Sequence, residues 1–366
     1  MWRRGIIGIV ACVTITGVQI KAARQDTVTL LFAGDAMSHT VQVKWARQGN
    51  TLDYSACFSG IKPYLERADL SIVNLEAPLA GAPYTGYPRF SAPNDYAEAL
   101  RDAGFNLMLL ANNHIADKGK AGLEKTIDEL EQLELPYTGA YRNSEARSCL
   151  YPYRKTFSNG YDSMQVTFYN CTYGTNGMPV YAPNEVNRID TAQIRDDLRE
   201  AGNDADNDAD IRVMCIHWGN EYQTRSSAAQ RETARWLAEA GFDLIIGSHP
   251  HVVQEVDTIT TTDGRKVTVF YSLGNMLSNQ RWRGSNGGIL AMVKLATAEK
   301  RITEVGYVPV YVHKGVWQGV RQYHLIPTAE VIDTIANLPI PKADRDSLRV
   351  FHNDTQRRLG NMQMIR

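Results

Sequence analysis

Short runs of apolar residues recur along the chain and alternate with amphipathic stretches. Each run is closed by polar residues or by glycine, which is typical of strands buried in a layered sheet. The runs that we expect to form strands are Val28–Phe32, Leu70–Val73, Leu107–Leu110, Ile211–Ile216, Leu244–Ile246 and Val267–Tyr271.

Two of the intervening stretches have the spacing of helices. Leucine and isoleucine recur at helical intervals over residues 123–133, and Pro136 follows as a stop. A second helix is expected over residues 226–240, with a serine as its N-cap and Gly241 as its terminator. The polar stretch 141–163 is expected to be a surface connection. Strands that alternate with helices in this way predict an α/β architecture.

Carboxylate, amide and imidazole side chains gather where the apolar runs stop. The residues of this kind are Asp35, Glu76, Asn113, His114, His217, His249 and His251. Loops at the carboxyl ends of strands converge on one crevice in α/β folds, so distant residues can meet there. Oxygen and imidazole ligands suit Mn, Fe or Zn rather than Ca. We therefore expect one or two divalent metal ions in this crevice.

Each of these residues also has an ordinary structural explanation. Asp35 alone would be a turn or cap residue, and His217 alone would be a core histidine. The pair His249 and His251 is harder to explain in this way, because Pro250 stiffens the link between two imidazoles that can face one crevice. The pair therefore favours the metal centre.

Six segments together carry a resemblance to a known family. They are Leu31–Met37, Asn74–Glu76, Ala111–His114, His217–Tyr222, Gly247–Gln254 and Tyr271–Asn275. In this order the chain resembles the bacterial CapA family, which is named for poly-γ-glutamate capsule synthesis. CapA-like domains are in turn similar to calcineurin-like metallophosphoesterases. The resemblance implies a four-layer αββα sandwich and the hydrolysis of a phosphoester.

The resemblance also implies a role for each side chain of the site. Asp35 and His251 would hold one ion, Asn113, His217 and His249 would hold the other, and Glu76 would bridge them. His114 matches the histidine that is not a ligand but can protonate a leaving oxygen as a general acid. Asp117 would either orient this imidazole or cap the following helix.

Met37 departs from the phosphoesterase pattern. It stands where those enzymes place the histidine of an Asp-x-His motif, and a thioether is a poor substitute for an imidazole on a hard ion. His39 is close in sequence, but the loop would have to bend to bring it in. The departure supports an alternative function, that of a non-catalytic scaffold or tether in polymer synthesis and export.

Residues that flank the ligands are candidates for substrate binding. They are Glu221, Tyr222, Asn275 and Arg281. We expect Arg281 and Arg283 to lie in a loop over the site, because a guanidinium donates two hydrogen bonds to a phosphate or carboxylate. Alternatively, both arginines pack on Trp282 between them.

The composition narrows the choice of partners. The chain of 366 residues carries 39 lysines and arginines against 40 aspartates and glutamates. This balance leaves no overall excess of positive charge for wrapping nucleic acid. We expect instead a small-molecule or polymer substrate with anionic groups, and capsule synthesis or export components as partners.

The first 25 residues have the features of a targeting segment. Arg3 and Arg4 precede an uncharged stretch over residues 5–20, which is short for a membrane-spanning helix. Cleavage after Ala23 and lipid attachment at Cys12 are the two alternatives. Either predicts export to the periplasm or to the outer face of the envelope, with membrane attachment only through this segment.

The rest of the chain is expected to form one principal domain. Residues 26–305 would be the CapA-like domain. Residues 306–366 would be an extension that adds a small sheet and a terminal helix to the core.

Overall fold

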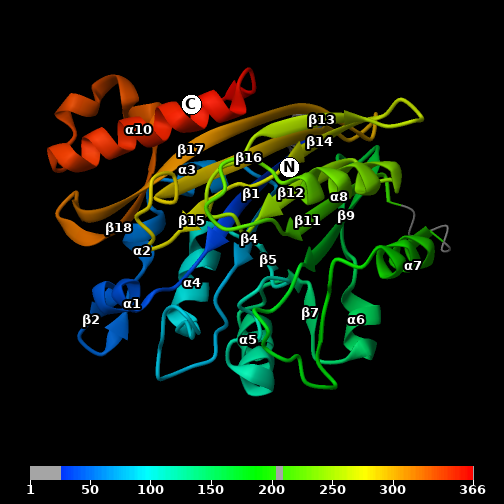
Figure 1. The fold of residues 1–366 in the computed structure, drawn as a ribbon, viewed down its shortest axis with the longest axis horizontal. Coiled ribbons are helices and arrows are strands. Elements are labelled where there is room, and N and C mark those ends of the chain that lie inside the picture. The colour runs from blue at the N-terminus through cyan, green and yellow to red at the C-terminus, as the bar shows by residue number, and fades with distance from the viewer. Residues whose placement is uncertain (1–25, 203–208, 366) are drawn as a thin grey trace, which may run out of the picture.

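The computed structural model describes residues 26–202 and 209–365 (Figure 1). The targeting segment that we expect over residues 1–25 lies outside this range. Within the described residues, no helix combines the length and the apolar character needed to cross a membrane.

The larger of the two main sheets has nine strands. Its order is β18 (Val320–Pro327), β17 (Arg301–Trp317), β16 (Gly287–Ala296), β1 (Thr27–Ala36), β4 (Leu70–Leu75), β5 (Leu107–Leu109) and β6 (Tyr137–Thr138). Two short strands lie off this path, where β15 (Asn275–Leu277) pairs with β1 and β19 (Gln363–Met364) pairs with β17. Because β1, β4, β5 and β6 are parallel, their carboxyl ends share one edge.

The second main sheet has six strands. Its order is β13 (Val256–Thr260), β14 (Lys266–Phe270), β12 (Leu244–Ser248), β11 (Ile211–His217), β9 (Ser163–Thr172) and β8 (Tyr153–Ser158). Four of these strands, β9, β11, β12 and β14, are parallel. Two ribbons complete the sheets, β7 (Ala140–Tyr141) with β10 (Glu185–Val186), and β2 (Arg47–Gln48) with β3 (Thr51–Leu52).

The two sheets pack face to face, and helices cover their outer faces (Figure 1). One apolar cluster joins alternate residues of both sheets, such as Phe32, Ile72 and Val213. The intervening residues, such as Leu31 and Met214, belong to a second cluster that includes helix residues. This period of two is what a strand buried on both faces requires. The expected αββα sandwich is therefore confirmed.

The helices that cover the nine-stranded sheet come mainly from the first third of the chain. They are α1 (Thr40–Ala46), α2 (Ser55–Phe58), α3 (Lys62–Leu65), α4 (Asn94–Ala103) and α5 (Gly119–Gln132). Those that follow are α6 (Ser144–Leu150), α7 (Thr191–Gly202), α8 (Ala228–Glu239), α9 (Thr328–Val331), η1 (Ile332–Asn337) and α10 (Lys342–Leu359). The second expected helix is α8, in which Ser227 caps the first turn and Gly241 (φ +108°) follows the last.

Two expectations about the fold are wrong. Residues 141–163 are not a plain connection, because they contain α6 and the edge strand β8. Neither element shows an apolar run, since α6 buries no residue and most of β8 is exposed or half-buried. Residues 306–366 form no separate small sheet, because β17 crosses residue 305 and continues the main sheet together with β18. The expected terminal helix is present as α10.

Candidate metal centre

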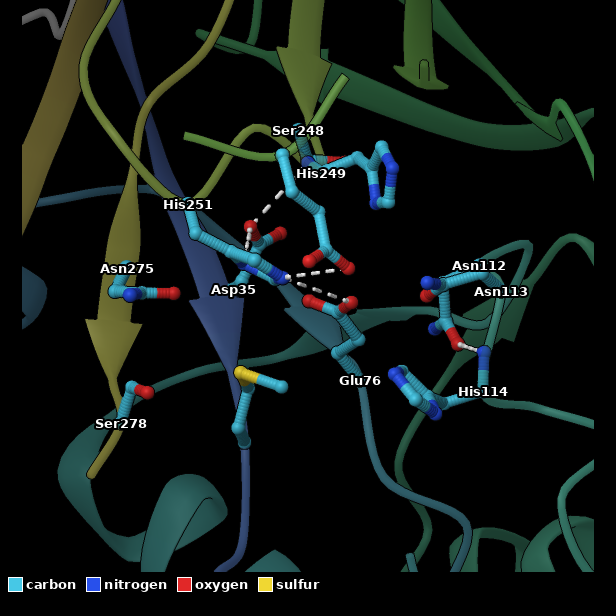
Figure 2. A network of polar contacts seen from close by, with 12 residues as sticks. Asp35, Glu76, Asn112, Asn113, His114, Ser248, His249, His251, Asn275 and Ser278 are labelled. Atoms are coloured by element: carbon cyan, nitrogen blue, oxygen red, sulfur yellow. Dashed lines mark hydrogen bonds and ion pairs between the residues drawn. The ribbon is translucent and has the colours of Figure 1, made fainter. Parts of the chain in front are cut away.

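Four parallel strands, two from each sheet, bring five of the expected ligands to one place, and Asn113 reaches it from the loop after β5. Figure 2 labels all six of these residues except His217. In the nine-stranded sheet, Asp35 lies at the end of β1 and Glu76 directly follows β4. In the six-stranded sheet, His217 ends β11, and the loop after β12 carries His249 and His251. The centre is therefore shared by both halves of the sandwich.

Glu76 lies in the middle of this cluster and is fully buried. Its Oε1 atom is 3.6 Å from His217 Nε2 and 3.9 Å from His251 Nε2. Neither carboxylate oxygen receives a hydrogen bond from the described residues. Burial, and then the negative charge of Asp35, raise the pKa of the Glu76 carboxyl well above its usual value.

Asp35 fixes the orientation of His251. Its Oδ2 atom accepts hydrogen bonds from the backbone N–H of His249 at 3.2 Å and from Nδ1 of His251 at 3.1 Å. Asn74 donates to the other oxygen at 2.8 Å. A proton on Nδ1 of His251 leaves its Nε2 lone pair free, and this atom faces Glu76 and the Oε1 atom of Glu221, 4.0 Å away.

His217 and Asn113 form the other side of the cluster. His217 Nε2 is 3.1 Å from Asn113 Oδ1, and His217 Nδ1 is 2.9 Å from Ser248 Oγ. The Nδ1 atom of His249 has no hydrogen-bond partner among the described residues. Burial, and then the neighbouring histidines, lower the pKa of His217 well below its usual value and that of His249 to about 3. Both imidazoles are therefore neutral and able to coordinate a cation.

The backbone of the β12 loop is strained where it presents these histidines. His249 has φ +98° and His251 has φ +59°, a region that residues with a side chain rarely adopt. Such conformations cost about 1–3 kcal/mol each and cluster at functional sites. The strain is offset by the bonds from both residues to Asp35.

The donor atoms fit a divalent cation. Three overlapping groups have donor atoms within 4.8 Å of one another, namely Glu76 with His217 and His249, Asp35 with Glu76 and His251, and Glu221 with His249 and His251. A buried carboxylate without a donor and a buried imidazole nitrogen without a partner are costly unless a cation satisfies them. Carboxylate and imidazole ligands suit Mn, Fe or Zn.

His114 and Asp117 form a buried pair beside the cluster. His114 Nδ1 is 2.8 Å from Asp117 Oδ2, and the same oxygen accepts the backbone N–H of Phe90 at 2.7 Å. Helix α5 has Lys118 as its N-cap, with no side-chain cap bond. Asp117 therefore orients His114 rather than capping the helix. Figure 2 shows the His114 ring turned toward Glu76.

Residues 29–280 match the model of the family described as bacterial capsule synthesis protein PGA_cap. The chain belongs to this family. The capsule biosynthesis protein CapA of Bacillus anthracis is 27% identical over 303 residues, which are 81% of this chain and 70% of the relative. The PGA biosynthesis protein CapA of Bacillus subtilis (strain 168) is 26% identical over 284 residues, 76% of this chain and 70% of the relative. The expected membership is thus confirmed.

Solved structures similar to the chain include a phosphatase from Mycoplasma pneumoniae, with a TM-score of 0.45 and 14% identity over 78% of this chain and 94% of that one. Another is the calcineurin-like phosphoesterase YfkN from Bacillus subtilis, with a TM-score of 0.41 and 13% identity over 90% of this chain and 98% of that one.

Three of the four predicted substrate-binding residues lie beside the cluster. Glu221 approaches His251, and the Tyr222 ring lies 6.0 Å from the His251 ring. Asn275 pairs in register with Asp35 across β1 and β15, and its buried Oδ1 atom has no partner among the described residues.

The two arginines that we expected over the site point elsewhere. Arg281 donates to the carbonyl of Val312 on β17, and its guanidinium lies 5.7 Å from the Tyr323 ring centroid. Arg283 forms a two-bond ion pair with Asp354 on α10. The loop therefore packs toward the carboxyl-terminal part of the chain, where backbone and carboxylate acceptors hold both guanidiniums.

Met37 and His39 do not supply a ligand. Met37 is buried, and its sulfur is 3.9 Å from Nε2 of Gln280. His39 caps α1 through its bonds with Gln42, and its ring packs against Phe90 at 5.1 Å. His39 does not belong to the candidate cation groups found among the described residues.

Sequence reasoning missed several neutral residues of the site. Asn74 and Ser248 position Asp35 and His217, and the Tyr173 ring lies 4.7 Å from the His249 ring. Tyr173 directly follows β9, a strand that we did not expect. The rule that functional residues follow strands would have found it if residues 163–172, with their apolar and polar alternation, had been assigned as a strand.

Proposed function

We propose that this chain is a metal-dependent phosphoesterase-type hydrolase that acts in the synthesis of a capsule or envelope polymer. One observation carries the proposal: the fully buried Glu76 carboxylate has no hydrogen-bond donor among the described residues and is surrounded by imidazoles. The His114 ring is turned toward it (Figure 2). Such an arrangement has no purpose in an ordinary core, where buried carboxylates are paired.

The proposed ligands are Asp35, Glu76, Asn113, His217, His249 and His251, and they would hold one or two ions. A bound divalent ion would polarise a phosphoryl oxygen and lower the pKa of a water molecule. The chain itself supplies orientation. Asp35 sets the ring of His251, and Ser248 sets that of His217.

His114 is the proposed general acid. With Nδ1 donating to Asp117, His114 would act as an acid in its imidazolium form, in which a second proton on Nε2 would pass to the leaving oxygen. Asp117 would stabilise the protonated imidazole before the transfer. The Phe90 ring, 4.7 Å away in an edge arrangement, and the Phe90 N–H hold this pair in place.

The biological setting is proposed from the relatives. Two of them are named for capsule or PGA biosynthesis. We propose that this chain acts in the same process, on an anionic polymer or its precursor, together with other synthesis or export components and not with nucleic acid. The segment over residues 1–25 would export it to the periplasm or the outer face of the envelope.

A second candidate function is that of a non-catalytic scaffold or tether in polymer synthesis. Met37 favours it, because this buried thioether stands at the position where phosphoesterases have a ligand histidine, and its sulfur is 3.9 Å from the Gln280 amide nitrogen. A centre with one ligand fewer would bind metal more weakly.

Metal analysis and a hydrolysis assay separate the two functions. Purified protein would be analysed for bound metal and tested with aryl phosphate monoesters and diesters, after chelation and after return of Mn²⁺. We expect the wild type to hydrolyse a substrate, and we expect chelation to abolish this activity and Mn²⁺ to restore it. The His217→Ala variant should have no such activity. A protein that binds metal but cleaves neither substrate would favour the scaffold, and one that binds no metal would contradict both the centre and the hydrolase.

A further inference from the structure

A basic pocket of about 400 Å³ lies outside the candidate metal centre. It is lined by Thr224, Arg225, Arg283, Asp354, Arg357 and Arg358. Four guanidiniums thus face one carboxylate, in a chain whose formal net charge is −1. A local excess of this kind, in a hollow with more than one arginine, is suited to an oxyanion.

The single carboxylate leaves much of this positive charge uncompensated. Arg283 binds Asp354 through Nε at 2.8 Å and through Nη2 at 3.1 Å, and Arg357 pairs with the same carboxylate. Among the described residues, the Arg358 guanidinium donates only to the backbone carbonyl of Val253, at 3.2 Å. The guanidinium of Arg225 has no hydrogen bond or ion pair within the described part of the chain.

The loop that carries Arg225 is held in place by a buried side chain. Nε2 of Gln254 donates to the carbonyls of Gln223 at 2.8 Å and of Arg225 at 3.0 Å. Gln254 is itself buried, and its Oε1 atom accepts from Gln230 at 3.0 Å. The backbone of Arg225 is therefore held in place before any ligand arrives, so binding has to order only its side chain.

We propose that this pocket binds an oxyanion group with two or more negative charges, a phosphate or a dicarboxylate, chiefly through Arg225 and Arg358. Asp354 pairs with Arg283 and Arg357 and competes with the ligand for them. Two of the pocket's arginines are linked to segments of the candidate metal centre. Arg225 follows Glu221 by four residues in the sequence. Arg358 donates a hydrogen bond to the carbonyl of Val253, which is two residues after His251. Binding there is independent of the proposed hydrolysis.

Calorimetric titration of the full chain in a chelator and at low salt tests the site. The probes are inorganic phosphate and the dicarboxylate glutarate, and a preference between them identifies the source of the anionic group. We expect binding that weakens about tenfold or more in Arg225→Gln and further in Arg225→Gln/Arg357→Gln, because each lost guanidinium removes charge-assisted bonds. Both side chains are exposed, so folding should not change.

Two further variants make the result decisive. Asp354→Asn should bind the anion more tightly than the wild type, because it removes the competing carboxylate. Arg199→Gln is the matched control, since this exposed arginine of α7 pairs with Asp196 in the described part of the chain and should leave binding unchanged. The proposal is overturned if the wild type binds neither probe, if the control loses as much affinity as Arg225→Gln, or if Asp354→Asn weakens binding.

Discussion

The effect of replacing Glu76 should differ between a metal centre and an ordinary protein core. Its carboxylate is buried without a donor among the described residues, so its charge is uncompensated when no cation is bound. We predict that Glu76→Gln, which keeps the shape and removes the charge, leaves the metal-free protein at least as stable as the wild type. The same variant should lose most of the stabilisation by Mn²⁺, as thermal unfolding with and without chelator would measure. A large loss of stability in the metal-free variant would mean that the carboxylate has a structural role.

The proposed acid role of His114 can also be tested by changing a single residue. A general acid accelerates the departure of a poor leaving group more than that of a good one. We predict that His114→Ala lowers kcat for an alkyl phosphate about 10²–10³-fold. For p-nitrophenyl phosphate the loss should be much smaller, since this leaving group departs without a proton. Asp117→Asn should follow the same pattern more weakly, because it disturbs only the orientation of the imidazole. Equal losses on both substrates would exclude the acid role.

At the scale of elements, the approach of β1 to the segment before β15 decides whether the ligands meet. A Cβ atom at Gly34 would lie 1.9 Å from the carbonyl oxygen of Gly274, which is a backbone atom and has no room to move. We predict that Gly34→Ala lowers the free energy of unfolding by about 3 kcal/mol or more and weakens metal binding. The control is Gly174→Ala, where a Cβ atom meets only Arg188 at 3.6 Å and should cost little. Denaturant unfolding of both variants checks this, and equal stabilities would contradict it.

The burial of each strand explains why the sequence predicts some elements and not others. Strands β1, β4, β11 and β12 are buried on both faces, so their apolar runs are visible, and the polar residues at or after their ends are the candidate ligands. Strand β8 lies at a sheet edge and is mostly polar, which makes it look like a loop. The prediction that Arg281 lies over the site was wrong for a related reason. The rule that functional residues follow strands gives the position of a residue along the chain, but it does not give the direction of a long side chain.

At the scale of the whole molecule, the candidate metal centre lies where the two sheets meet, so a cation that binds there should stabilise the entire sandwich. Asp35 and Glu76 come from one sheet, and His217, His249 and His251 come from the other. A cation that binds only the folded state adds about 2.7 kcal/mol at one hundred times its dissociation constant. We predict that Mn²⁺ raises the unfolding temperature of the wild type and that chelation reverses the shift. The shift should disappear in Asp35→Ala and equally in His217→Ala, since each removes the contribution of one sheet. If it persists in either variant, the cation is held by a single sheet, and the centre does not join the two halves of the fold.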